Sequence, residues 1–338
     1  MEFNEIVLNH GSGGRLSREL FESVFGRHFN NPILNQMTDS AIARCPAKNI
    51  AFTTDSYVVD PLFFPGGTIG SLAVCGTIND LSVSGATPVM LSAGFIIEEG
   101  FSVSSLEKIV ADMARMAETA GVNIVTGDTK VVDRGKCDGI FINTAGIGSL
   151  GDENRHISFG DTVTAGDKII VNGTIGDHGM AIVSTRNRIH LHTTIQSDCA
   201  PLNNLISEVL DESSQVRFMR DATRGGLATV LCECAGNRDF GIDIDESEIP
   251  LKAGVKGLCE MLGFDPLYVA NEGKVIVIVS PRDADKVLGR MRGHRLGKDA
   301  AVIGEIVDEH PGRVILKTAI GGRRIVEIPA GDQLPRIC

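Results

Sequence analysis

The chain alternates short apolar runs with longer segments in which apolar residues recur at every third or fourth position. The first pattern predicts strands and the second predicts amphipathic helices. In the first half, strands are predicted at residues 50–56, 89–97, 122–125 and 140–148, and helices at 16–25, from 68 to about 85, and at 102–120. Strands that alternate with helices in this way indicate an α/β or α+β fold.

The second half continues the alternation after a polar stretch at residues 151–166, where we place a domain boundary. Strands are predicted at 168–171, 274–280, 301–307, 314–316 and 325–328, and helices end near residues 186, 210, 235, 262 and 291. A chain of 338 residues is longer than one core usually serves. We expect an N-terminal loop and helix at 1–40, a first domain at 41–150, an α/β domain at 151–330 and a flexible tail at 331–338.

Charge and composition narrow the class of protein. The net charge of −11 argues against a nucleic-acid partner, because phosphate binding needs a basic surface. The first five residues are acidic where a signal peptide would be basic, and no apolar run reaches the roughly 18 residues of a membrane span. The eight cysteines include no CxxC pair, which argues against structural zinc. We therefore expect a cytoplasmic protein without a membrane segment.

A glycine-rich segment lies near the N-terminus, where Gly11, Ser12, Gly13 and Gly14 stand between His10 and Arg15. Glycines free the backbone to turn its N–H groups toward an anion such as a phosphate. The spacing is not that of a Walker A loop, which needs GxxxxGK followed by Ser or Thr. The alternative is a flexible turn ahead of the next helix.

Carboxylates stand at the ends of predicted elements in the first half. Asp55 ends a strand, Asn79 and Asp80 lie in a long apolar helix, and Asp128 and Lys130 follow another strand. A carboxylate in an apolar helix is costly unless it is paired or binds a metal. Side chains two apart on an extended segment point the same way, so Asp128 suits a hard cation and Lys130 a neighbouring phosphate. Turn capping and a solvated helix face are the alternatives. Together with the glycine loop, these residues predict a magnesium–nucleotide site.

Three motifs of the second half carry weaker signals. The glycines of 172–179 are interpreted as a tight turn, which makes His178 structural. Residues 218–227 are predicted to be a loop that opens the helix ending at Ala235. The alternatives there are a cap by Asp221 or Thr223 and an anion bound at the start of the helix. Glu272 precedes a glycine at the start of a strand and is a candidate base, with turn formation as the alternative.

The last residue is a cysteine, Cys338, and the segment before it mixes helix breakers with polar residues. A cysteine on a mobile end has reach and no core to fill. The sequence therefore predicts either a carrier thiol on a flexible tail or a frayed terminus that happens to end in cysteine.

Taken together, these motifs resemble the HypE family of hydrogenase maturation factors, within the superfamily of aminoimidazole ribonucleotide synthetase, thiamine-monophosphate kinase and selenophosphate synthetase. The matching segments are His10–Arg15, Thr53–Ser56, Gly76–Pro88, Gly127–Lys130, Asn172–Gly179, Arg220–Gly226, Asn271–Gly273 and Pro335–Cys338. The resemblance implies a two-domain fold like that of aminoimidazole ribonucleotide synthetase. Its first domain, a mixed sheet with helices, dimerises and binds ATP near the dimer interface, and its second is an α/β sandwich.

The resemblance also implies a reaction. A partner, HypF, would carbamoylate Cys338, and ATP would drive dehydration of this thiocarbamate to a thiocyanate. The nitrile would then pass to a HypC–HypD complex as a cyanide ligand for the iron of a [NiFe] hydrogenase. Phosphorylation of the amide oxygen creates the leaving group, so such a site needs magnesium, a lysine and a base.

The residues then receive expected roles. We expect Asp55, Asp80 and Asp128 on magnesium, with Asn79 beside them, and the glycine loop over the phosphates of ATP. Lys130 is expected on the transferred phosphate or the carbamoyl oxygen, and Glu272 is expected to be the base. Two alternatives stay open: an ATP-dependent kinase or synthetase acting on a free small molecule, and a carrier without catalytic activity.

Overall fold

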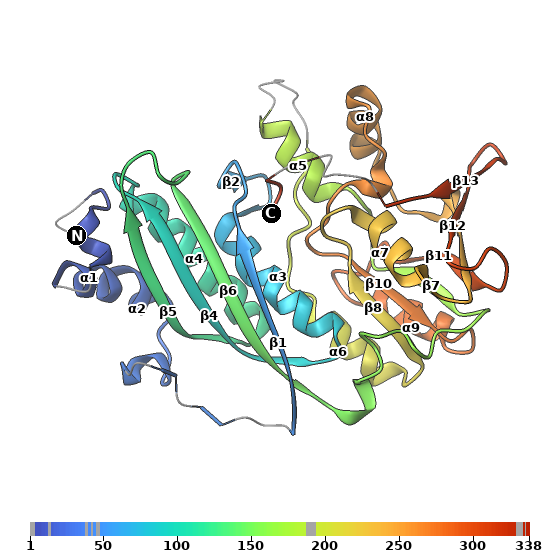
Figure 1. Ribbon diagram of the computed structural model, residues 1–338, viewed down its shortest axis with the longest axis horizontal. Helices are drawn as coiled ribbons and strands as arrows, with labels where there is room; N and C mark the ends of the chain where they lie inside the picture. Colours follow the sequence, from blue (N-terminus) through green and yellow to red (C-terminus); the bar gives the residue numbers. More distant parts are fainter. Residues whose placement is uncertain are drawn as a thin grey trace.

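The computed structural model describes residues 4–12, 15–37, 40–41, 43–44, 48–186, 194–328, 334 and 336–338. A four-stranded sheet forms the first domain, in the order β1 (Asn49–Tyr57), β6 (Ile140–Leu150), β4 (Thr87–Glu98), β5 (Asn123–Val132). Only the β4–β5 pair is parallel, so the sheet is mixed. Helices α3 (Ile69–Val83) and α4 (Val103–Ala120) cover one face (Figure 1).

The N-terminal segment packs at the β5 side of this sheet, as Figure 1 shows. It consists of short helical turns: η1 (Leu8–Gly11), α1 (Arg15–Leu20), η2 (Phe21–Phe25), α2 (Gly26–His28) and η3 (Leu34–Gln36). Phe25 and Phe95 of β4 stack with ring centroids 4.8 Å apart, which ties the segment to the core of the first domain.

A seven-stranded sheet forms the second domain. Its order is β13 (Arg323–Val326), β12 (Val314–Lys317), β9 (Gly241–Asp245), β11 (Ala301–Val307), β7 (Lys168–Val171), β10 (Val275–Val279), β8 (Val216–Asp221). Helices α6 (Asn203–Glu212) and α9 (Ala284–Gly293) pack on one face and α7 (Gly226–Ala235) on the other. The remaining elements are α5 (Asp177–Arg186), α8 (Ala253–Leu262), a two-stranded sheet of β2 (Phe63–Phe64) and β3 (Gly67–Thr68), and the 3-10 turns η4 (Asp152–Asn154), η5 (Glu246–Glu248) and η6 (Pro266–Tyr268).

Helix α3 joins the two domains, because it contacts β1 and β6 on one side and β8 and α6 on the other. Every residue of α3 is buried except Asp80. A helix that is apolar all round is typical of such a fully enclosed position. A Cβ added at Gly76 would lie 2.2 Å from the hydroxyl of Tyr57, so the glycine allows the close packing of α3 on β1.

The face of the first sheet opposite α3 and α4 is open and partly apolar. Phe52 is 65% exposed and Ile50 and Ile96 are also exposed, while their strand neighbours point into the core. Among the helices that the structure describes, none is long and apolar enough to span a membrane.

The mixed α/β fold predicted from the sequence is confirmed. Four strands were missed: the two-residue strands β2 and β3, and β8 and β9 of the larger sheet. The prediction treated Phe218–Asp221 as loop, but these residues pair with β10 across a seven-stranded sheet. Pairing of this kind is non-local and leaves little trace in a short segment that carries two arginines.

Candidate functional site

An acidic cleft lies where the first domain meets the second. Asp55 on β1, Asp80 on α3 and Asp221 at the end of β8 come together here, and Asp80 and Asp221 line a cavity of about 470 Å³. The hydroxyl of Thr53 donates to Asp80 at 2.8 Å, and that of Tyr57 donates to Asp55 at 3.2 Å. The sheet of one domain and the strand end of the other therefore build the cleft together.

The carboxylates of this cleft repel one another. Burial, with Asp221 and Asp55 nearby, raises the pKa of Asp80 to about 7. Burial, with Asp55 nearby, also raises the pKa of Asp221 to about 6. A divalent cation would relieve the repulsion between these clustered carboxylates, whose pKa values are raised. Carboxylate oxygens are also the ligands that magnesium prefers. Carboxylates are donors that suit magnesium, but among the described residues no group of three or more His, Cys, Asp or Glu is arranged to hold a metal, so one chain alone leaves such a site incomplete.

Basic groups line the same cleft. Arg220, Thr223 and Arg224 stand beside Asp221, and Arg220 pairs with Glu233 at 2.8 Å. The prediction that Asp221 or Thr223 caps α7 is wrong. The cap is Gly225, with φ of 72°, a left-handed conformation that favours glycine. Asp221 is therefore left to face the cleft.

A second group of predicted residues lies at the other edge of the first sheet. Lys130 and Asp128 pair at 2.7 Å, and their side chains are 61% and 69% exposed. Gly11 packs against the backbone of Lys130 and Val131, and a Cβ added there would lie 2.4 Å from the nitrogen of Val131. Ser12 donates to the carbonyl of Asn9 at 3.0 Å. Gly13 and Gly14 lie outside the described residues.

This second group borders a cavity of about 340 Å³ between the N-terminal segment and β5. Its walls are largely apolar, with Phe25, Phe29, Ile33 and Met37 among them, and Gly11, Asp128 and Lys130 line it as well. An apolar cavity with a few charged groups is the usual form of a small-molecule site.

The expected triad of Asp55, Asp80 and Asp128 is not assembled within one chain. Asp55 is in register with Thr144 on the helix-covered face of the sheet, whereas Asp128 is in register with Gly94 on the open face. Their strands, β1 and β5, are the two edges of the sheet. Asp221 is the third carboxylate of the cleft instead.

Glu272 lies deep between the domains and is 3% exposed. Its Oε1 atom has no hydrogen-bond partner among the described residues. Burial raises the pKa of Glu272 well above its ordinary value, and Cys199, Asp198, Asp221 and Asp55 add to the shift. This environment therefore favours the neutral form of its side chain.

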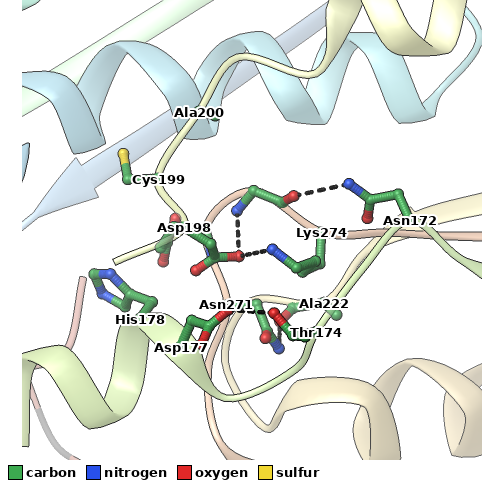
Figure 2. Close-up of polar contacts among 12 residues, drawn as sticks. Asn172, Thr174, Asp177, His178, Asp198, Cys199, Ala200, Ala222, Asn271 and Lys274 are labelled. Carbon is green, nitrogen blue, oxygen red and sulfur yellow. Dashed lines mark hydrogen bonds and ion pairs between the residues drawn. The ribbon is translucent and has the colours of Figure 1, made fainter. Parts of the chain in front are cut away.

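The backbone around Glu272 is held rigidly. Asp198 accepts from the N–H groups of Glu272 at 3.2 Å and Gly273 at 3.0 Å, and pairs with Lys274 at 2.8 Å (Figure 2). The amide of Asn79 donates to the carbonyls of Glu272 and Ala200, and its oxygen accepts from Leu202. Asn79, expected beside a cofactor, thus has its side chain occupied in joining the two domains.

The end of the tail is docked on the body of the protein. Ile337 is 2% exposed, and the N–H of Val58 donates to the main-chain oxygen of Cys338 at 3.2 Å. In Figure 1 the C-terminus lies beside the end of β1 and α3. The sequence predicts a tail that is flexible and does not pack on the folded domains. Its described residues do pack there, because Leu334 and Ile337 are buried in the hydrophobic cluster that includes the first-domain core, and Cys338 packs against that cluster.

Two sheets joined through a buried helix, with carboxylates at the junction, define a member of the AIR synthase related class. Residues 37–150 match the family model described as "AIR synthase related protein, N-terminal domain", and residues 164–317 match the corresponding C-terminal domain. The chain is 50% identical to the carbamoyl dehydratase HypE of Rhodobacter capsulatus over 336 residues, which cover 98% of each protein. The chain belongs to the HypE family.

Two solved structures agree with this assignment. A hydrogenase maturation protein HypE in complex with ATP superposes with a TM-score of 0.94, at 45% identity, over 98% of this chain and 99% of that one. A HypE chain from a HypE–HypF complex superposes with a TM-score of 0.80, at 48% identity, over 94% of this chain and 100% of that one.

Proposed function

We propose that this protein is an ATP-dependent carbamoyl dehydratase that acts on its own C-terminus. It converts S-carbamoylated Cys338 to a thiocyanate and so supplies the cyanide ligand for maturation of [NiFe] hydrogenase iron. The observation that carries the proposal is the docked tail. The main-chain oxygen of Cys338 accepts a hydrogen bond from the N–H of Val58. Val58 follows Tyr57 and is three residues along the chain from Asp55 of the acidic cleft.

The reaction balances as a dehydration coupled to ATP hydrolysis. The carbamoyl oxygen attacks the γ-phosphate, and the carbon–oxygen bond then breaks with phosphate as the leaving group. The nitrogen loses both protons, which leaves S–C≡N, ADP and phosphate. Glu272 is the base we propose for the N–H protons, once it is ionised, and Lys130 neutralises charge on the transferred phosphate.

We propose that ATP binds in the cavity of about 340 Å³, with its base against the apolar wall and its phosphates toward Gly11 and Lys130. Asp55, Asp80 and Asp221 would hold magnesium. The ion would supply charge neutralisation for the phosphates. The ATP complex of a relative in the same family supports ATP as the ligand, and the apolar lining of the cavity supports this placement.

We propose that two copies of the chain associate through the open face of the first sheet. Asp128 and Lys130 lie on that face, and Phe52 lies both on it and at the rim of the acidic cleft. A second copy packed there would bring Asp128, Lys130 and the glycine loop of one subunit toward the cleft of the other. This would complete the magnesium site that one chain leaves incomplete.

A HypF-like carbamoyltransferase would load Cys338, and a HypC–HypD complex would receive the nitrile. The structure of a HypE–HypF complex supports the first partner for this chain. Both transfers need a reduced thiol, which favours the cytoplasm as the place of action.

The deciding experiment is an intact-mass measurement on protein carbamoylated at Cys338 by HypF. Addition of Mg–ATP is expected to remove the mass of one water from the C-terminal peptide, because dehydration is intramolecular and needs no further substrate. A Cys338→Ala variant, which should still bind ATP, is the control and should gain no carbamoyl mass. An unchanged mass with ATP bound would point to a passive carrier. ATP turnover by the Cys338→Ala variant with a soluble acceptor would point to a small-molecule kinase.

The proposed dimer is tested by Phe52→Asp, which places a charge on the open face. We expect the variant to sediment as a monomer at concentrations where the parent protein is a dimer. Burial of an unpaired charge at the interface costs about 2 kcal/mol or more per subunit. Ile320→Asp is the matched control, because Ile320 is 96% exposed and far from that sheet. A dimeric Phe52→Asp protein would contradict this interface.

A further inference from the structure

We infer that α5 is the receptor for the C-terminal tail and that His178 and Arg186 are positioning residues that set the place of Cys338. This inference rests on the proposed function, in which the sulfur of Cys338 carries the reacting group. It concerns how the sulfur is placed and not which residues do the chemistry.

The His178 ring is fixed from both sides. It is fully buried, its Nε2 lies 2.8 Å from the carbonyl of Ile337, and its Nδ1 lies 2.8 Å from the hydroxyl of Ser197. A carbonyl can only accept, so Nε2 carries the proton; burial lowers the pKa of His178 and favours the neutral ring, in which Nδ1 accepts from Ser197. Phe64 meets the ring edge-on, with centroids 5.5 Å apart. Figure 2 shows His178 on α5 facing the chain segment of Asp198 and Cys199.

Arg186, at the other end of α5, holds the preceding tail residue. Its guanidinium donates to the carbonyls of Arg336 and Asp60. Two consecutive tail carbonyls, those of Arg336 and Ile337, are thus received by two side chains of one helix. A planar guanidinium that bridges the tail to the segment after β1 fixes both distance and direction.

Backbone pairing sets the register. The N–H of Val58 donates to the main-chain oxygen of Cys338 at 3.2 Å, and that of Asp60 donates to the carbonyl of Arg336 at 3.3 Å. The tail therefore runs antiparallel to the segment that follows β1. Arg336 adopts a left-handed conformation, with φ of 54°, which an arginine takes only where surrounding contacts hold it.

These contacts place Cys338 at one register position beside Val58, three residues along the chain from Asp55. A reacting group held in this way gains the rate advantage of proximity, and a displacement of about 1 Å forfeits much of it. The same contacts are weak enough individually to release the tail for loading by a partner. The α5 side chains therefore decide how long Cys338 stays in place.

The test measures alkylation of Cys338 by N-ethylmaleimide in the ATP-free, unloaded protein, from the mass of the C-terminal peptide. Cys232, partly exposed and on α7 of the second domain, serves as the internal reference. Arg186→Ala is expected to raise the Cys338 rate relative to Cys232 by roughly tenfold, the usual effect of losing a charged hydrogen bond. His178→Ala is expected to do the same, and His178→Gln, which keeps a donor, less.

Arg292→Ala is the matched control, because Arg292 also donates to one backbone carbonyl, that of Ala300, in the second domain. It should leave the Cys338 rate unchanged. If His178→Ala fails to fold, the more accessible Arg186 decides alone. Wild-type alkylation in Arg186→Ala would overturn the inference. Since the assay uses neither ATP nor carbamoyl group, faster alkylation would stand even if the loaded parent protein lost no water, a result that would overturn only the proposed function.

Discussion

Replacement of Asp80 by asparagine is expected to lower the rate of ATP-dependent dehydration by about a thousandfold or more. The same replacement should make the ligand-free protein more stable at pH 8. The loss follows because Asp80 is the carboxylate of α3 that faces the acidic cleft, and electrostatic stabilisation of the transferred phosphate depends on the cation proposed there. The gain follows because asparagine removes one of the mutually repelling charges. A merely structural carboxylate would not give these opposite effects together.

The pH dependence of that stability gain has a definite sign. The pKa of Asp80 is raised to about 7 in the folded protein, from an ordinary value of 3.8. The folded state therefore binds more protons than the unfolded state between these values, and the free energy of unfolding falls as pH rises through 7. The advantage of Asp80→Asn is complete at pH 8, on the order of 1–3 kcal/mol, and shrinks toward pH 5.

Thermal unfolding at both pH values, together with the intact-mass assay, measures the two effects. Asp245→Asn is a control with the opposite expectation, because Lys317 and Ser247 hold the pKa of Asp245 at about 2. That variant should keep its activity and be somewhat less stable above pH 4. An Asp80→Asn protein that still dehydrates the loaded tail would remove Asp80 from the proposed magnesium site.

The sequence located the carboxylates but could not assemble them. Apolar periodicity predicted the strands that carry Asp55 and Asp128, and the alternation rule put Asp128 and Lys130 on one side of β5, as their 2.7 Å contact shows. The order of the strands in the sheet could not be predicted in this way. Nothing in local pattern says that β1 and β5 are opposite edges of the sheet, or that their carboxylates face opposite ways.

Asp221 illustrates the converse problem. Its neighbourhood, rich in glycine ahead of a helix, favoured a local explanation as a cap, although the same pattern is also typical of anion sites at helix ends. Only the pairing of β8 with β10 brings Asp221 to the cleft. The docked position of the tail could not be predicted from the sequence either. It depends on contacts with Val58 and α5, which are far from the tail along the chain.

Replacement of Glu272 by glutamine is expected to slow dehydration of the loaded tail by about 10²–10⁴-fold, the usual contribution of a general base, with ATP affinity unchanged within about twofold. Glutamine fits the same buried space, so the backbone clamp by Asp198 and Asn79 should survive. Truncation to alanine would open a cavity and confuse the result. Glu212→Gln, on the surface beside Lys286 and Arg290, is the control and should retain full activity.

The pH–rate profile separates a base from a structural residue. Burial raises the pKa of Glu272 well above its ordinary value and so disfavours its ionised form. A base must be ionised, so the single-turnover rate of the ATP-saturated, loaded protein should rise with pH through this raised pKa. The residual rate of Glu272→Gln should lack that rise. If the variant showed the parent's profile with only a lowered amplitude, Glu272 would act by positioning and the base would have to be another group near the docked sulfur.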